Sequence, residues 1–326
     1  MPQITVKNLV KTFRVAERES GVWGAVKGLA SRRHRVVRAL DGISFTLEPG
    51  ELVGYIGPNG AGKSTTVKVL SGILVPDSGD VQILGYVPWK ERIQYVANIG
   101  VVFGQRTQLW WDLPVIESFD LLKDIYKVPS EQYVESRDEL IDLLNLGDFL
   151  DTPVRQLSLG QRMRCDLAAS LMHSPSVLFL DEPTIGLDAV SKIAVRDFIR
   201  RINRERGTTV ILTTHDMDDI EALCNRIMVI GNGKILSDGT LSELRSRISN
   251  ERHLTVHLAN DGIDIEDPDA EVVDREENRI RLRFDPDKIP AATLISRIAS
   301  RYPVRDLFVE NPPIEEIIAE LYRTIK

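Results

Sequence analysis

A glycine-rich segment at residues 57–65 constrains this chain more than any other feature. It reads Gly-Pro-Asn-Gly-Ala-Gly-Lys-Ser-Thr, which fits the phosphate-binding pattern of a glycine, four residues and then Gly-Lys-Ser. The mostly apolar run 51–56 precedes it, and Val67, Leu70 and Leu74 follow at helical spacing. The glycines are therefore expected on a turn from a buried strand to a helix. Backbone N–H groups and the positive end of a helix dipole converge on an anion at such a turn.

This loop predicts a binding site for a nucleoside triphosphate. Lys63 would reach the β- and γ-phosphates, and the hydroxyl of Ser64 would bind Mg²⁺. A glycine-rich turn without a ligand is the alternative, which the flanking strand and helix disfavour. The loop residues expected to bind the nucleotide are Gly57, Asn59, Gly60, Gly62, Lys63, Ser64 and Thr65.

The composition is that of a soluble globular protein. The 326 residues suffice for about two domains, with 43% hydrophobic and 27% charged residues. No apolar run reaches the roughly 18 residues that a spanning helix needs, and residues 1–6 do not resemble a secretory signal. Cys165 and Cys224 have no metal-binding spacing and lie on apolar helical faces, so both are expected to be buried packing residues. These features favour the cytosol, and any membrane work would need a separate subunit.

The formal charge of −7 is unevenly distributed. The acidic balance argues against a nucleic-acid binder. Residues 11–38, however, carry eight Lys or Arg against two Glu. Within the basic insertion at 16–38, apolar residues at helical spacing stand beside a basic cluster, which resembles an interfacial helix at a membrane. A solvated basic loop and a docking element for a membrane subunit are the alternatives.

Alternating strand and helix patterns predict an α/β fold with a parallel sheet and helices on its faces. The first strand is expected to begin at Ile4 and end near Phe13, and strand character to resume at residues 42–47. A helical pattern at about 106–172 predicts a helical subdomain inserted into the core. The character changes again near residue 248. Residues 1–248 and 249–326 are therefore expected to form a main domain and a small C-terminal α+β domain.

Two further motifs identify a family. Residues 157–161 read Leu-Ser-Leu-Gly-Gln, and the apolar run 177–180 ends in Asp181 and Glu182. Together with the phosphate loop, in this order and spacing, they resemble the nucleotide-binding subunit of an ATP-binding cassette (ABC) transporter, a P-loop NTPase. The resemblance covers about residues 1–245. The segments similar to the ABC-2-type multidrug and viologen exporter branch are 85–89, 108–114 and 215–220.

Asp181 and Glu182 are expected at the carboxyl edge of the sheet, beside the phosphate loop. The carboxylate of Asp181 can hold Mg²⁺ directly or through water. Glu182 suits a general base that polarises the attacking water. Two solvated acids at a strand end are the alternative.

The resemblance implies roles that the residue patterns alone do not reveal. His215, which ends the next strand, would reach the γ-phosphate as the family's switch histidine, or else cap a helix. Gln105 would sense Mg²⁺ and the membrane subunit, with Gln108 as a neighbouring alternative. Phe13 would stack on adenine, or else be an edge or core residue.

The resemblance also implies a dimer that sandwiches two ATP molecules. In the family, the segment at 157–161 caps the ATP bound to the partner subunit, which assigns this role to Ser158, Gly160 and Gln161. Leu159 stands where the family usually has glycine. Asp188 resembles the loop that joins the two sites across the dimer, and an ordinary helix N-cap is its alternative.

These features predict an ATP-hydrolysing subunit that pairs with a second copy of itself or a related ATPase subunit. It would act on the cytoplasmic side of the membrane and power export of a small hydrophobic or cationic compound through a separate transmembrane permease. An importer ATPase whose C-terminal domain senses a solute is one alternative, and a small-molecule pocket in residues 254–326 would favour it. A soluble ABC ATPase that acts on ribosomes or DNA is another, which the single cassette and the acidic charge disfavour.

Overall fold

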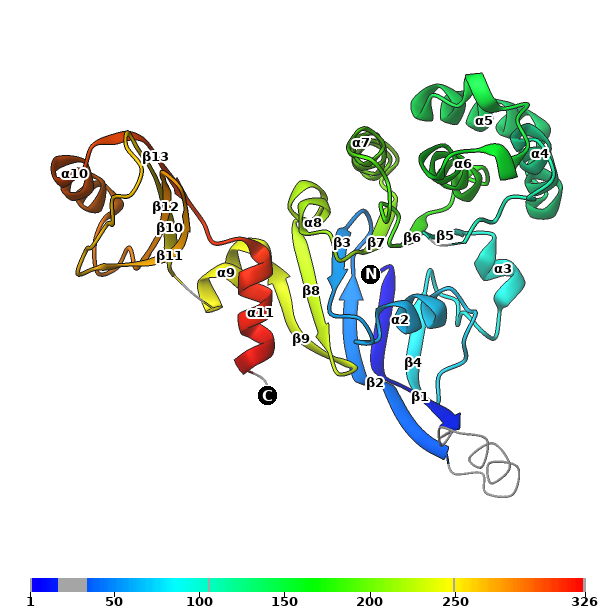
Figure 1. Ribbon diagram of the computed structural model, residues 1–326. Coiled ribbons are helices and arrows are strands. Elements are labelled where there is room, and N and C mark those ends of the chain that lie inside the picture. The colour runs from blue at the N-terminus through cyan, green and yellow to red at the C-terminus, as the bar shows by residue number, and fades with distance from the viewer. Residues whose placement is uncertain (1, 17–33, 105, 249, 325–326) are drawn as a thin grey trace, which may run out of the picture. The chain divides into compact units, whose positions relative to one another are not determined.

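The computed structural model describes residues 2–16, 34–104, 106–248 and 250–324. The chain forms two compact units, Met1–Gly239 and Thr240–Lys326 (Figure 1). The first is a mixed α/β unit with an inserted group of helices, and the second is a small α+β unit. The fold class predicted from the sequence is therefore confirmed.

A six-stranded sheet forms the centre of the first unit. Its strands, in spatial order, are β5 (Ile99–Phe103), β6 (Val177–Asp181), β7 (Thr209–Thr213), β3 (Leu52–Ile56), β8 (Arg226–Gly231) and β9 (Lys234–Thr240). Pairing is parallel from β5 through β8. β3, β6 and β7 are buried at every position, as parallel strands are when helices cover both faces of a sheet. Their side chains cannot alternate between core and solvent, so they read as continuous apolar runs.

A second, antiparallel sheet packs against this centre. It contains β1 (Ile4–Ala16), β2 (His34–Leu47) and β4 (Ser78–Ile83) in the order β2-β1-β4. One apolar core joins this sheet to the central sheet and to α2 (Lys63–Leu70), and it includes Val6, Phe45, Tyr55 and Val67. The helix that follows the phosphate loop is thus held by contacts from both sheets.

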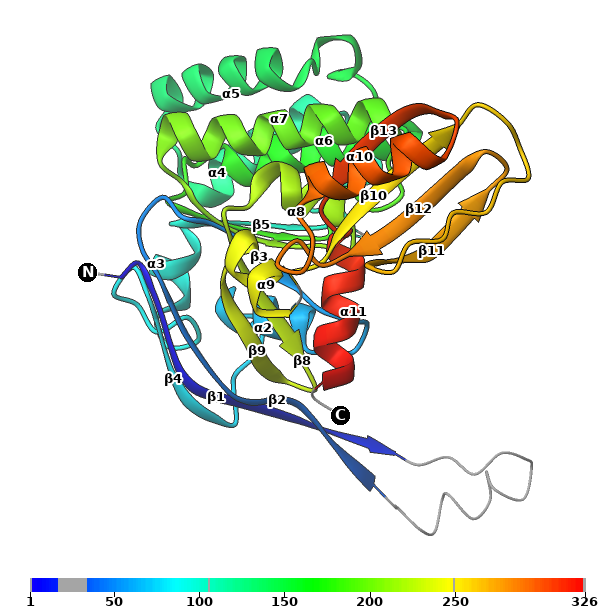
Figure 2. The same ribbon diagram turned by 90° about the vertical axis from the view of Figure 1, so that its left-hand side faces the viewer.

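The first two strands are longer than predicted. β1 continues to Ala16 and β2 begins at His34, and the two stay paired to their outer ends (Figure 2). The prediction that strand character stops near Phe13 and resumes at residue 42 is wrong. The outer ends face solvent on both sides, with Val15 51% and Val36 61% exposed, so no buried alternation marks them in the sequence. The helix expected within 16–38 falls on residues 17–33, which lie outside the described residues.

The helices of the first unit fall into two groups. α4 (Val115–Tyr126) and α5 (Ser130–Leu144) pack on α6 (Leu159–Leu171), and the three lie together in Figures 1 and 2. Two 3-10 turns, Gly147–Phe149 and Val154–Gln156, connect α5 to α6. The other helices in the described part of this unit are α2, α3 (Arg92–Val96), α7 (Ala189–Arg206) and α8 (Met217–Leu223). Cys165 and Cys224 are both free and buried, as predicted.

The second unit is built on a four-stranded antiparallel sheet. Its strands are β11 (Ala270–Glu276), β12 (Arg279–Phe284), β10 (Arg252–Leu258) and β13 (Val304–Glu310), in that spatial order. One face packs on α10 (Ala291–Arg301), where Leu254, Leu282 and Ile298 belong to a common core. α9 (Leu241–Ile248) and α11 (Ile314–Thr324) complete the unit and contact each other.

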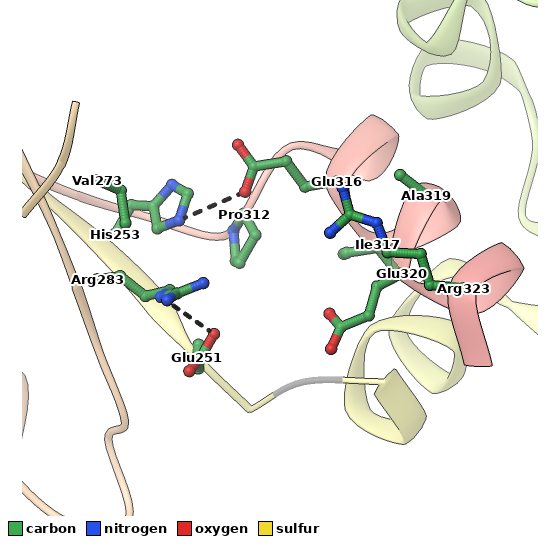
Figure 3. Close-up of a pocket in the computed structure, with 10 residues that line it drawn as sticks. All are labelled: Glu251, His253, Val273, Arg283, Pro312, Glu316, Ile317, Ala319, Glu320 and Arg323. Carbon is green, nitrogen blue, oxygen red and sulfur yellow. Dashed lines mark ion pairs between the residues drawn. The ribbon is translucent and has the colours of Figure 1, made fainter. Parts of the chain in front are cut away.

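A cavity of about 610 Å³ in the second unit is lined by strand residues and by α11 (Figure 3). The almost fully buried His253 lies 3.7 Å from the carboxylate of Glu316 through its Nε2 atom. Arg283 lies 3.6 Å from Glu251. Arg323 also lines the cavity, from the last turns of α11. No helix in the described part of the chain is long and apolar enough to cross a membrane.

Asp77 provides a test of how the antiparallel sheet is anchored. Its carboxylate accepts hydrogen bonds from the Thr12 hydroxyl at 2.7 Å, from Lys11 Nζ at 2.9 Å and from the Thr12 N–H at 2.6 Å. These bonds hold the pKa of Asp77 at about 2. Because the group is partly exposed, Asp77→Ala should lower the free energy of unfolding at pH 7 by only about 1 kcal/mol.

The pH dependence of this loss has a definite sign. The folded pKa lies below the unfolded value of about 3.9, so the stabilisation is present above that value and disappears as the pH falls toward 2. Urea unfolding of wild type and Asp77→Ala should therefore differ at pH 7 and converge in acid. Asp142→Ala, at an exposed position of α5, is the control and should show neither effect. Equal stability of wild type and Asp77→Ala at pH 7 would refute the anchoring role.

Candidate nucleotide-binding site

The phosphate loop joins β3 to α2, as its sequence pattern predicts. Gly62 has φ 115°, a left-handed conformation that favours glycine, and α2 begins at the next residue. A Cβ at Gly57 would lie 2.3 Å from the Ile230 carbonyl oxygen, so the chain passes too closely there for a side chain. Among the described residues, no side chain caps α2, which leaves the N–H groups of its first turn available to an anion.

Lys63 lies across this loop. Its Nζ donates to the carbonyl oxygen of Gly57 at 2.7 Å and to that of Pro58 at 3.3 Å. Burial lowers the pKa of Lys63, and the charges of Glu182 and Asp181 partly offset that effect. The ammonium group is thus held between the loop backbone and the end of β6, where a phosphate could replace the carbonyls as its partner.

The last residue of β6 forms an oxygen-rich cluster with the loop. Ser64 Oγ donates to Asp181 Oδ1 at 3.3 Å, and the Thr213 hydroxyl at the end of β7 donates to the same oxygen. A hydroxyl and a carboxylate side by side fit Mg²⁺, which prefers oxygen ligands and takes one or two carboxylates together with substrate phosphates. Thr213 was not predicted. The signal was available, because parallel strands that are neighbours end at the same edge of a sheet.

Glu182 follows directly and has an unusual backbone. Its φ is 56°, in the left-handed region, which costs a residue other than glycine about 1–3 kcal/mol. The strands on both sides enforce this conformation. The N–H of Glu182 donates to the Thr213 carbonyl at 2.9 Å, and the Gly104 N–H donates to the Asp181 carbonyl at 2.8 Å. The side chain turns toward His215, whose Nδ1 lies 3.4 Å from Glu182 Oε1.

Some of these groups border a cavity of about 500 Å³, which is large enough for the phosphates of a nucleotide. Asn59, Ser64, Asp181 and Glu182 line it. Two basic residues that the sequence analysis missed also line it. Lys68 comes one turn after Ser64 on the same face of α2, a spacing that could have revealed it, and Arg106 follows the end of β5. No local pattern marks Arg106.

Ser158, Gly160, Gln161 and Asp188 form a separate group. Ser158 caps α6, accepting from the Gln161 N–H at 3.2 Å while its own N–H donates to Gln161 Oε1 at 2.8 Å. Asp188 caps α7 through the N–H and hydroxyl of Ser191, both at 2.9 Å. A Cβ at Gly160 would lie 2.5 Å from the Ser191 hydroxyl, so the two helix starts are packed together. None of the four is among the described residues that line the phosphate cavity.

Phe13 does not line the phosphate cavity. Phe13 lies on the outer part of β1 opposite Val37, 37% exposed, with Lys11 Nζ 5.7 Å from its ring centre. Phe13 is thus an exposed strand residue and not a core residue. Gln105 lies outside the described residues. Gln108 donates through Nε2 to the Asp166 carbonyl at 2.9 Å, so its side chain is directed to α6.

Comparison with known proteins agrees with this arrangement. The family described as "ABC transporter" matches residues 40–185. The linearmycin resistance ATP-binding protein LnrL of Bacillus subtilis (strain 168) is 32% identical over 288 residues, which cover 86% of this chain and 92% of LnrL. The daunorubicin resistance ATP-binding protein DrrA3 of Streptomyces coeruleorubidus is 37% identical over 223 residues, covering 68% of this chain and 70% of DrrA3.

A solved structure shows the same fold. A dimeric ATP-binding cassette in a post-hydrolysis state, bound to ADP and Pi, superposes with a TM-score of 0.61 at 25% identity, covering 73% of this chain and 98% of that one.

The fold and the phosphate site define an ATPase of the cassette class. More particularly, the chain belongs to the ATP-binding proteins of ABC transporters, whose reaction converts ATP and water to ADP and phosphate. The family and the ATPase activity that the sequence predicts are therefore confirmed.

Gly104 offers a test of the enforced conformation at Glu182. A Cβ at Gly104 would lie 2.0 Å from the Glu182 carbonyl oxygen, and two paired strands prevent the backbone from moving away. Gly104→Ala should therefore lower the free energy of unfolding by about 2 kcal/mol or more and should also displace Glu182. Gly147→Ala is the matched control, because nothing lies within 4 Å of a Cβ there. Denaturant unfolding of both variants measures the difference, and equal stability would show that the close approach at Gly104 is not as tight as described.

Proposed function

We propose that this chain acts as a dimer, with a second copy of itself or a related ATPase subunit, to power export through a separate transmembrane permease. The cargo would be a small hydrophobic or cationic compound, and the dimer would sit at the cytoplasmic side of the membrane. The similarity to LnrL, a protein named for linearmycin resistance, carries this proposal. Because the match covers more of the chain than the first unit contains, the likeness extends into the second unit.

The chemistry follows from the groups around the phosphate cavity. Lys63 and the N–H groups of the loop would bind the β- and γ-phosphates. Ser64 and Asp181 would hold Mg²⁺, which supplies positive charge against the phosphate oxygens. Glu182 would accept the proton of the attacking water, and His215 would contact the γ-phosphate from the other side of that carboxylate. The rigid backbone of Glu182 keeps its carboxylate beside the loop without help from the substrate.

The arrangement of α6 supports a dimer. Ser158 and Gly160 stand at the start of α6, and neither residue lines the phosphate cavity of its own chain. A helix start is a natural partner for phosphate. The nucleotide it would meet is therefore the one bound to the partner, with Gln161 and Asp188 beside the contact and Gln105 and Phe13 completing the site as the family resemblance implies.

Glu182→Gln tests the central step. The amide keeps the size of the side chain but cannot accept the proton, so the hydrolysis rate should fall by about 10²- to 10⁴-fold, or roughly 3–5 kcal/mol of barrier. ATP binding should persist, measured by equilibrium binding of a labelled nucleotide. Glu117→Gln, at an exposed position of α4, is the control and should hydrolyse ATP normally. Hydrolysis by Glu182→Gln at the wild-type rate would remove Glu182 from the role of base.

Export itself is tested by purification from native membranes. A membrane protein should co-purify with the chain, and amphiphilic cations should raise the ATPase rate of that complex. Co-purification of ribosomes or DNA without a membrane protein would instead favour the soluble ABC ATPase.

The cavity of the second unit favours one rival, an importer ATPase with a solute-sensing domain (Figure 3). In that case a solute would inhibit the ATPase of the complex, and Arg323→Ala, in the cavity wall, would abolish the inhibition. Stimulation by exported compounds that is unchanged in Arg323→Ala would support export.

A further inference from the structure

The described residues on either side of Gln105 are attached to two parts of the fold, Gly104 to the end of β6 and Thr107 and Gln108 to α6. At one end, the Gly104 N–H donates to the Asp181 carbonyl at 2.8 Å. At the other end, the Thr107 hydroxyl donates to Asp166 Oδ1 at 2.9 Å, and the Gln108 N–H donates to the same oxygen at 3.0 Å. Only two residues lie between Gly104 and Thr107 in the sequence, so the short chain limits how far the end of β6 and α6 can move apart.

Asp166 is an unusual residue for its position. It is 4% exposed on α6, where its neighbours Cys165, Leu167 and Ala168 are buried and not charged. Burial raises its pKa to about 6, although the bonds from Gln108 and Thr107 act against this shift. A buried carboxylate costs stability unless hydrogen bonds satisfy it. An apolar side chain would be buried here at a lower cost in folding free energy. Stability alone therefore does not explain why a carboxylate with two hydrogen-bond donors occupies this position.

Arg106 connects these bonds to the phosphate cavity. It lines the phosphate cavity together with Ser64, Asp181 and Glu182. It also lines a smaller cavity of about 200 Å³ together with Thr107 and Asp166. A displacement of Thr107 relative to β6 would therefore change the position of Arg106 in the wall of the phosphate cavity.

We propose that Asp166 is a positioning residue of the ATPase, which sets the place of residues 106–108 against Asp181 and Glu182 from α6, the helix that Ser158 caps. α6 thereby joins its own first turn to the site of hydrolysis in the same chain. A movement of the first turn, such as a partner's nucleotide would cause, is carried along the rigid helix for about 12 Å to Asp166. It then passes through Thr107 to Arg106. The role of this connection between the two subunits rests on the proposed dimer contact. The hydrogen bonds themselves, and their effect on hydrolysis within one chain, do not depend on that contact.

Thr107 allows a test with little disturbance of the core. Thr107→Val keeps the shape of the side chain and removes the hydroxyl, which donates to Asp166 and also accepts from the Leu109 N–H at 3.1 Å. Thr107→Ser keeps the hydroxyl and both bonds. Loss of the bond to the charged Asp166 corresponds to about tenfold in rate if the bond acts in the transition state. In the full-length chain, Thr107→Val should lower kcat for ATP hydrolysis about tenfold and leave KM for ATP within about twofold. Thr107→Ser should restore wild-type kcat.

Asp166 variants complete the test from the other side. Asp166→Asn keeps an oxygen that can accept both bonds and should retain most of the activity, whereas Asp166→Leu should resemble Thr107→Val. The double variant Asp166→Leu, Thr107→Val should be no slower than the slower single variant, because both changes break the same connection. Rates are divided by the number of ATP-binding sites per sample, so loss of folded protein does not count as loss of kcat.

Three outcomes would overturn the proposal. Thr107→Val could hydrolyse ATP at the wild-type rate per site. Its loss could appear in KM and not in kcat, which would indicate a role in holding ATP. Losses in the double variant could multiply, which would show that the residues act separately. A failure of Glu182→Gln to lose activity, or of a permease to co-purify, would contradict the proposed function without affecting these results.

Discussion

The hydrogen bonds at the end of β6 are the interaction on which the rest of the site depends. Asp181 accepts from Ser64 of the phosphate loop and from Thr213 of the neighbouring strand, so one carboxylate ties the loop to two strands of the sheet. The backbone of the next residue is forced into a left-handed conformation between Gly104 and Thr213. The side chain of Asp181 is held by Ser64 and Thr213, whereas the backbone of Glu182 is held between Gly104 and Thr213, so the two consecutive carboxylates are directed to different neighbours.

The surrounding core supplies the free energy that keeps Glu182 in its unfavourable backbone conformation. β3, β6 and β7 are buried at every position, and the apolar contacts of α2 join the central sheet to the antiparallel one. A conformation that costs about 1–3 kcal/mol at Glu182 is maintained because breaking the strands on either side would cost more. The same rigidity fixes the chain where it leaves β5 at Gly104. A few residues later, Thr107 and Gln108 are hydrogen-bonded to Asp166 of α6.

Two buried carboxylates, Asp219 and Asp166, join separate segments of the first unit through hydrogen bonds. The buried Asp219 accepts from Thr184, Thr214 and Arg196, which ties the segment after Glu182 to the segment that carries His215 and to α7. Asp166 does the same for α6 and the segment after β5. Asp219 has donors from three separate segments, whereas both donors to Asp166 come from one segment; each carboxylate thus fixes chain that would otherwise be held only at its ends. Neither carries a sequence motif.

The sequence alone determined the class of fold, the family and the ATPase activity. A phosphate loop needs glycine where the chain passes too closely for a Cβ, as at Gly57, and buried parallel strands need uninterrupted apolar runs, so both leave a local trace. Only the tertiary structure decided the features that leave no local pattern in the sequence. The solvent-exposed ends of β1 and β2 lack buried alternation, so their length could not be foreseen. Thr213, Arg106 and Asp166 acquire their roles only from neighbours that are distant in the sequence, because a hydrogen bond across elements requires the fold to bring its partners together.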